Sequence, residues 1–360
     1  MMPMDTVDGV QAFVARGLDE VRLVLAAHLA RVQAELPAAG ADYRDLWDAV
    51  GDLHLAGKNL RPMLTLAAYS GLGGRDTRAI APIAAAVEML HAAMLIHDDL
   101  LDGDEVRRGR PNVAGARRIA LEGTGLSPAQ VEAHVRAAAV LGGDLALSSA
   151  YDLVARADIA SHHRIACLDL LTRAVRTTIA GELRDMYADA RAPEDAEPLV
   201  IAELKTATYS VVVPLLAGAQ LAGADPTMTA HLERLGTALG LSFQLVDDDL
   251  GVFGDPAVTG KSVLSDLRAG KRTELMRLGF AHADAAGRAV LAGAVGDPAL
   301  DEAAAARVRE VLVSSGARER ALLTARQQAR IARRIAYERI PAPLSGYLVD
   351  LIATLEERTS

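Results

Sequence analysis

Two acidic clusters, each closing a long apolar segment, constrain this chain more than any other feature of its sequence. Residues 95–102 read LIHDDLLD, and residues 243–250 read FQLVDDDL. Carboxylates at positions i and i+4 of a helix lie on one face, so Asp98 and Asp102 point the same way with Asp99 beside them. Like charges this close, at the end of an apolar helix, repel unless a multivalent cation neutralises them.

The two clusters together indicate one metal site. Sites built from carboxylate oxygens favour hard ions such as Mg²⁺, which keep several waters and share their ligand shell with substrate phosphates. For either cluster alone, an ordinary solvated helix end is the alternative interpretation. Because two such clusters are present, ordinary solvated helix ends are a much weaker explanation.

Composition predicts an all-α fold, formed by a single domain over residues 1–360. Aromatic residues make up 3% of the chain and β-branched runs are few, so strands have little to be built from. Hydrophobic residues make up 51%, enough for a sizeable core. Apolar spacing and Gly/Pro breaks predict these helices: 8–35, 42–56, 60–71, 79–102, 128–157, 163–190, 197–222, 228–250, 273–293, 302–316, 318–337 and 342–357.

Three further features predict a cytoplasmic protein. Cys167 is the only cysteine, which excludes an internal disulfide framework and suits a reducing compartment. No basic region precedes an apolar stretch at the N-terminus, so we expect no signal peptide. The longest apolar stretch, 80–96, contains Glu88 and His91 and is interpreted as a buried helix with no membrane span.

The net charge and the positions of the lysines together predict a small anionic ligand held by nearby basic side chains. The net charge of -9 argues against nucleic acid as a partner, because a phosphate backbone needs a broad basic surface. The chain has 38 basic residues, of which only four are lysines, and three of these follow glycine. Lysine beside glycine in a loop is typical of a compact charge that approaches a ligand closely. The lysines are Lys58, Lys205, Lys261 and Lys271.

The order of these segments resembles the order of motifs in the polyprenyl synthetase family of trans-isoprenyl diphosphate synthases. The family's DDxxD motif and RRGxP loop are similar to 98–102 (DDLLD) and 107–111 (RRGRP), and its GGKRxRP segment is similar to 56–62 (AGKNLRP). Its Lys-Thr pair and second Asp-rich motif follow as 205–206 (KT) and 243–248 (FQLVDD). The motif positions run from Lys58 to Arg272 and include all four lysines.

The resemblance implies a magnesium-dependent condensation of isopentenyl diphosphate with an allylic diphosphate. It implies that up to three Mg²⁺ ions bridge the allylic diphosphate to Asp98, Asp102 and Asp247. The implied catalytic residues also include Asp99, with Arg107, Lys205 and Lys261 on the outer diphosphate oxygens and Thr206 and Gln244 facing the carbocation. The implied substrate-binding residues are Lys58, Arg61, His91, Arg108, Asp248 and Lys271. The family fold, helices around a deep cavity, and a homodimer are expected as well.

Two positions depart from the family pattern. Where the family has the third aspartate of the second motif, this chain has Gly251. If the motif is instead aligned to begin at Asp248, the third aspartate corresponds to Val252. Asp249 or Asp255 could add negative charge nearby. Asn59 stands where the family has arginine, which removes one charge from the expected isopentenyl diphosphate site; Lys58 and Arg61 could compensate.

The resemblance also bears on product length and leaves other functions open. The family's chain-length positions, the fifth and fourth residues before Asp98, are Ala93 and Met94. Neither is aromatic and residues 98–102 contain no two-residue insertion, which together favour a product longer than farnesyl diphosphate. Geranylgeranyl diphosphate is expected first, a longer polyprenyl diphosphate next and farnesyl diphosphate third. A class I terpene cyclase, a noncatalytic synthase subunit and a His-Asp phosphohydrolase are the alternatives. The basic segments and the intact DDxxD argue against all three.

Overall fold

A computed structural model describes residues 6–55, 59–107, 109–255 and 263–356 of the chain. The predicted site residues Lys58, Arg108 and Lys261 lie outside these ranges. The all-α prediction is confirmed, since the only strands in the described part of the chain are β1 (Val106–Arg107) and β2 (Arg110–Pro111), which form one antiparallel hairpin. The chain divides into two compact units, and the prediction of a single domain stays a prediction.

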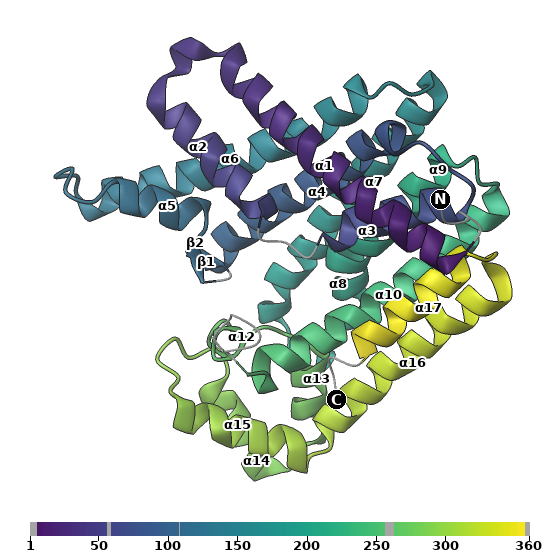
Figure 1. The fold of residues 1–360 in the computed structure, drawn as a ribbon. Coiled ribbons are helices and arrows are strands. Elements are labelled where there is room, and N and C mark those ends of the chain that lie inside the picture. The colour runs from purple at the N-terminus through teal and green to yellow at the C-terminus, as the bar shows by residue number, and fades with distance from the viewer. Residues whose placement is uncertain (1–5, 56–58, 108, 256–262, 357–360) are drawn as a thin grey trace. The chain divides into compact units, whose positions relative to one another are not determined.

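The first unit comprises residues 1–172, 213–229 and 341–344. Its central helix is α4, which packs against α1, α3, α6 and α9 (Figure 1). Ala84, Val87 and Leu90 of α4 are almost completely buried, so this helix forms the core of the unit. The elements are α1 (Val7–Glu35), η1 (Pro37–Ala39), α2 (Gly40–Leu55), α3 (Leu60–Gly71), α4 (Thr77–Asp102), α5 (Val113–Ala120), α6 (Pro128–Arg156), the start of α7 (Ser161–Met186) and α9 (Val213–Leu221).

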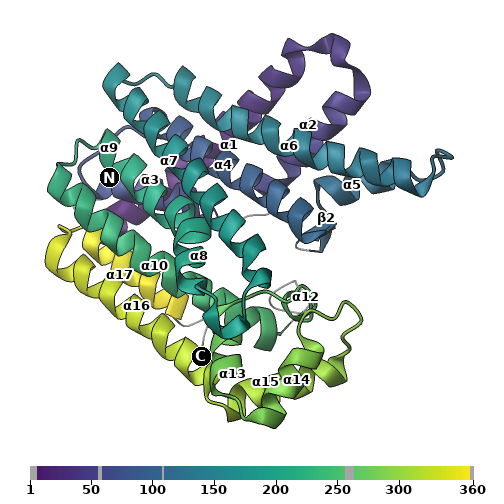
Figure 2. The same ribbon diagram turned by 180° about the vertical axis from the view of Figure 1, so that it is seen from behind.

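The second unit comprises residues 173–212, 230–340 and 345–360. Its helix α13 packs against α14, α15 and α16 (Figure 2). Leu275, Leu291 and Val308 belong to the core cluster of this unit. The elements are the rest of α7, η2 (Tyr187–Ala190), η3 (Pro193–Asp195), α8 (Pro198–Ala202), the π-helix η4 (Glu203–Val212), most of α10 (Pro226–Phe253), α12 (Ser265–Arg268), α13 (Glu274–His282), α14 (Ala285–Ala294), α15 (Glu302–Ser314), α16 (Ala317–Arg339) and α17 (Leu344–Glu356).

Most predicted helices lie within a few residues of their observed bounds, but the short helix α12 was not predicted and three larger differences are found. Helix α5 was missed, although Asn112 caps it by accepting a hydrogen bond from the Gly115 amide. The helix predicted over 273–293 is two helices, because Asp284 caps a new one by accepting from the Gly287 amide. The helix predicted over 197–222 contains the π-helix η4.

Three helical stretches of the described chain have the length and composition to cross a membrane. They are Thr77–Asp102, Pro128–Arg156 and Pro198–Leu221. In the first of these, 72% of the most apolar window is buried inside the protein. Its apolar side chains therefore serve the core of the first unit, as the sequence interpretation of residues 80–96 expected.

Candidate active site

The first Asp-rich motif forms the last turn of α4. Gly103 ends the helix in a left-handed conformation, with φ of 72°, and its amide donates to the Asp99 carbonyl. Asp98 keeps 26% of its side-chain surface exposed and Asp102 is exposed, whereas Asp99 is buried. Carboxylates in the last turn face the negative end of the helix dipole, which disfavours them unless a cation is near. Asp98 and Asp102 therefore present an accessible carboxylate pair that favours a bound cation.

Arg107 pairs with the buried member of this motif. Its Nε donates to Asp99 Oδ1 at 2.9 Å and Oδ2 at 3.1 Å, its Nη2 also donates to Oδ1, and Nη2 lies 3.7 Å from Asp98 Oδ2. Burial lowers the pKa of Arg107, but the hydrogen bonds to Asp99 and the charges of Asp99, Asp98 and Asp104 outweigh it, so the pKa lies above its usual value. The Nε and Nη2 groups of Arg107 are thus engaged in hydrogen bonds with Asp99.

The hairpin that carries Arg107 is anchored by its neighbours. Asn112 Nδ2 donates to the Asp104 carbonyl at 2.7 Å, and the Asn112 amide donates to the Glu105 carbonyl at 3.0 Å. A Cβ on Gly115 would lie 2.1 Å from that Glu105 carbonyl oxygen, so only glycine permits this close approach. These contacts fix the segment that leads from Asp102 to Arg107.

The predicted isopentenyl diphosphate residues of the first unit lie on α3 and α4. Arg61 is half-buried in the first turn of α3, and His91 is buried on α4 about two turns before Asp98. Asn59 precedes α3 with φ of 52°, a left-handed conformation that asparagine tolerates better than arginine. The departure at Asn59 therefore has a backbone explanation.

Lys205 is held by two carboxylates of α7. Its Nζ donates to Glu182 Oε1 at 3.1 Å and to Asp185 Oδ2 at 2.8 Å. Lys205 and Thr206 lie at the start of the π-helix η4, a form that often marks functional positions. A Cβ on Gly181 would lie 2.4 Å from the Lys205 backbone nitrogen, so this glycine lets α7 and η4 approach closely. Sequence reasoning missed both Glu182 and Asp185.

The three aspartates of the second motif have three different surroundings on α10. Asp247 is exposed. Asp248 accepts a hydrogen bond from Gln244 Nε2 at 2.7 Å, and its pKa is raised to about 8, chiefly by burial and further by Asp247 and Asp266. Asp249 is buried and accepts from Arg318 Nε at 2.8 Å and Nη2 at 3.0 Å.

These contacts change the expected roles of two residues near the second motif. Asp249 is neutralised by Arg318, so it adds little negative charge to a metal site. The Gln244 amide, expected to face a carbocation, is engaged by Asp248 one turn further along α10. Lys271 lies 3.7 Å from Asp266, measured from Nζ to Oδ1. Asp247 is the accessible carboxylate of this motif.

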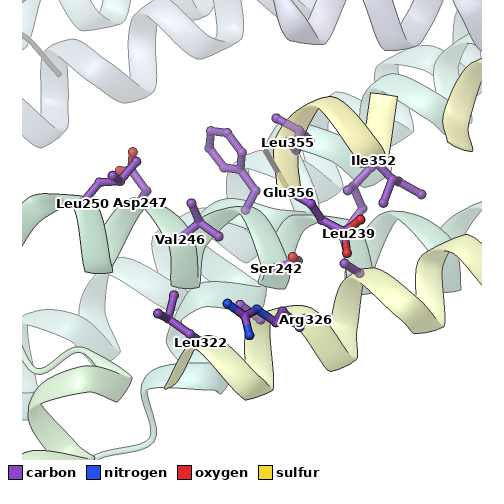
Figure 3. A pocket seen from close by; sticks show the side chains of 13 residues that line it. Leu239, Ser242, Val246, Asp247, Leu250, Leu322, Arg326, Ile352, Leu355 and Glu356 are labelled. Atoms are coloured by element: carbon purple, nitrogen blue, oxygen red, sulfur yellow. The ribbon is translucent and has the colours of Figure 1, made fainter. Parts of the chain in front are cut away.

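A pocket of the second unit lies between α10, α16 and α17 (Figure 3). Its empty volume is about 570 Å³, part of it open to solvent. Val246, Leu322 and Leu355 are among its apolar lining, and Asp247 is the predicted site residue that borders it. Phe243, the first residue of the second motif, is half-buried and lines this pocket.

The carboxylate donors fit magnesium bound together with diphosphate. Oxygen donors are the ligands that Mg²⁺ prefers, and it keeps positions for water and phosphate oxygens. Within the described ranges, no three His, Cys, Asp or Glu residues form a group that could hold a metal alone. Asp98 and Asp102 belong to the first unit and Asp247 to the second. Mg²⁺ bound to the carboxylates of either unit would therefore need further ligands, such as water or substrate oxygens.

Comparison with known proteins identifies the family. The sequence model of the polyprenyl synthetase family matches residues 48–312. The (2E,6E)-farnesyl diphosphate synthase of Mycobacterium tuberculosis is 36% identical over 275 residues, covering 75% of this chain and 71% of that protein. The geranylfarnesyl diphosphate synthase of Aeropyrum pernix is 34% identical over 301 residues, covering 81% and 86%.

A solved structure agrees with this assignment. The geranylgeranyl pyrophosphate synthase from Corynebacterium glutamicum, crystallised with isoprenyl diphosphate and magnesium, superimposes with a TM-score of 0.87 at 27% identity. The match covers 99% of this chain and 100% of that one. The chain belongs to the polyprenyl synthetase family. It is a trans-prenyltransferase that condenses isoprenyl diphosphates.

Proposed function

We propose that this protein uses Mg²⁺ to condense isopentenyl diphosphate with an allylic diphosphate, and that its main product is geranylgeranyl diphosphate. The observation that carries the proposal is the accessible Asp98 and Asp102 pair at the end of α4, with Arg107 fixed beside it by Asp99. Dianionic substrates need such a combination of metal-binding carboxylates and a fixed cation.

The allylic diphosphate is assigned to Asp98, Asp102, Asp247 and Lys205, the positions that the family motifs give. Bound Mg²⁺ supplies positive charge where negative charge develops on the leaving diphosphate. Arg107 and Lys205 contribute fixed cationic hydrogen-bond donors, and Lys261 and Lys271 are assigned to the same diphosphate. Asp99 acts on substrate only through Arg107, so it is a positioning residue.

Isopentenyl diphosphate is assigned to Arg61 and His91, with Lys58 and Arg108. Its double bond forms the new carbon–carbon bond as the allylic carbon–oxygen bond breaks, and the proton that it loses goes to the departing diphosphate. Thr206 is assigned a position facing the carbocation, because a hydroxyl dipole stabilises positive charge. We also propose that the protein acts as a homodimer in the cytoplasm, where its buried free thiol, Cys167, stays reduced.

A phenylalanine at Met94 is expected to shorten the main product by one five-carbon unit. Met94 is half-buried one turn before Asp98 on α4, so it lies on the accessible side of the helix. Ala93 is completely buried, and Ala93→Phe is expected to overpack the core by roughly 1–3 kcal/mol. Mass spectrometry of the products, with thermal unfolding of each variant, separates the two effects. Met94→Leu is the control of similar volume, and unchanged products from Met94→Phe would contradict the assignment.

The proposed function is tested by the products of the purified protein. The protein is supplied with Mg²⁺, isopentenyl diphosphate and each allylic diphosphate in turn, and products are separated by chain length. We expect diphosphates lengthened by five-carbon units, with the twenty-carbon product predominating. A hydrocarbon or alcohol formed from the allylic diphosphate alone would mean a cyclase instead. A predominant product of another length would overturn only the assignment of geranylgeranyl diphosphate as the main product. The condensation activity would stand.

A further inference from the structure

Gly251 leaves a space on α10 that another carboxylate fills. A Cβ built on Gly251 would lie 2.1 Å from Asp266 Oδ2 and 3.2 Å from Asp266 Cγ. Gly251 is not among the glycines with positive φ, so the helix itself does not require glycine here. Glycine inside a helix costs about 0.5–1 kcal/mol relative to alanine. The benefit that offsets this cost is room for the Asp266 side chain.

This position is four residues beyond Asp247, on the same face of α10. It is the position at which the second Asp-rich motif has its third aspartate in the family. The carboxylate of Asp266 therefore lies against α10 one turn from Asp247, close to where a carboxylate at position 251 would project. The chain has no aspartate at position 251, but the fold places Asp266, from a later segment, next to this position.

The approach of Asp266 is fixed by its neighbours in the chain. Val252 and Leu267, the residues that follow Gly251 and Asp266, are buried in the same core cluster. The Leu267 carbonyl accepts from the Gly296 amide at 2.8 Å, and the Lys271 amide donates to the Asp266 carbonyl at 3.1 Å. This anchoring means that Asp266 is held against α10 by packing that does not depend on a ligand.

The other acidic candidates near α10 are less suitable. Asp249 is neutralised by its two hydrogen bonds from Arg318. Asp248 is engaged by Gln244. Asp266 has Lys271 as a neighbour at 3.7 Å, a longer contact that leaves its carboxylate weakly paired by comparison. Asp247 and Asp266 are thus the pair of carboxylates best placed to share a cation on this helix face.

We propose that Asp266 replaces the missing third aspartate of the second Asp-rich motif, and that Gly251 is present to admit it. The second half of the magnesium–diphosphate site is then built from Asp247 and Asp266, with Lys271 beside them. This inference rests on the proposed magnesium site. It assigns Gly251 and Asp266 as a matched pair, so changing either one alone disturbs the same half of the site.

The test measures metal binding with Mn²⁺ and inorganic pyrophosphate as probes. Bound Mn²⁺ per chain is followed by electron paramagnetic resonance as Mn²⁺ is titrated at fixed pyrophosphate. Gly251→Ala and Asp266→Asn are each expected to weaken the binding of one Mn²⁺ by about 10–100-fold, the usual effect of disturbing a metal site's supporting groups. The double variant Gly251→Asp/Asp266→Ala removes the atoms that a Cβ at position 251 would meet and returns a carboxylate to α10, so it is expected to recover most of the affinity.

Matched controls separate this effect from general damage. Gly293→Ala adds a Cβ to a helical glycine with nothing within 4 Å, and Glu310→Gln removes an exposed charge from α15. Both are expected to bind Mn²⁺ as the parent protein does. Asp266→Asn preserves the shape of the side chain, so it remains informative if Gly251→Ala folds poorly.

The outcomes distinguish this inference from the proposed function. If the parent protein binds Mn²⁺ with pyrophosphate and both single variants match it, the Asp266 assignment is overturned and the magnesium site stands. If the parent protein binds no Mn²⁺, the magnesium site and this inference fail together. Weakened binding in both single variants, with recovery in the double variant, supports the pairing.

Discussion

Asp98→Asn is expected to lower kcat by about 10³-fold, which corresponds to roughly 4 kcal/mol of lost transition-state stabilisation. The amide keeps the size of the side chain but removes the charge that holds the cation at the end of α4. Because Asp98 is partly exposed and Arg107 contacts it only at 3.7 Å, the fold is expected to remain intact. Steady-state kinetics at saturating Mg²⁺, combined with thermal unfolding, measure both effects.

The control for this variant is Asp158→Asn, which removes an exposed carboxylate outside the motif. It is expected to leave kcat within a factor of two. Asp102→Asn is expected to behave as Asp98→Asn does, since the two carboxylates lie on one helix face. A kcat for Asp98→Asn within tenfold of the parent value would refute the first motif as the catalytic metal site.

Arg107→Ala is expected to lower the free energy of unfolding by about 3–5 kcal/mol, because it leaves a buried carboxylate without its partner. The Asp99 side chain is 3% exposed and takes its hydrogen bonds from the Arg107 guanidinium. A loss of this size lowers Tm by roughly 10 °C in a domain of this scale. Thermal unfolding followed by circular dichroism gives the shift.

Two comparisons separate the ion pair from the hairpin that carries it. Arg110 is the residue opposite Arg107 in the hairpin and is exposed, so Arg110→Ala is expected to change Tm little. The double variant Asp99→Leu/Arg107→Leu removes both charges and is expected to be more stable than Arg107→Ala. Equal losses from Arg107→Ala and Arg110→Ala would show that the hairpin, and not the ion pair, provides the stability.

The helices were largely predictable because their signals are local. Apolar spacing placed α4 and α10 correctly, and their acidic ends followed directly from the sequence. The break before α14 could also have been found, since Asp284 three residues before Gly287 is an ordinary capping pattern. The π-helix η4 has no such local signal; it packs closely against Gly181 and Gly240 of other helices, contacts that the sequence does not reveal.

The contacts of the site residues were less predictable because they join distant parts of the chain. Asp249 and Arg318 are 69 positions apart, and nothing local marks them as a pair. Gly251 could be read from the sequence only as a lost aspartate. Its steric consequence for Asp266 depends on how the intervening segment returns to α10. Sequence motifs therefore predicted which residues form the site, but not which of them neutralise one another.

If Lys205 binds the allylic diphosphate, as proposed, its two carboxylate neighbours affect which anions can reach it. With Glu182 and Asp185 in direct contact, the three side chains carry one net negative charge when all are ionised. Free phosphate or uncomplexed diphosphate is therefore repelled on approach and has to displace two carboxylates to reach the ammonium group. A diphosphate that already carries divalent metal is repelled far less. On the proposed assignment, Lys205 in this arrangement would favour metal-loaded substrate over the bare anions that compete for it.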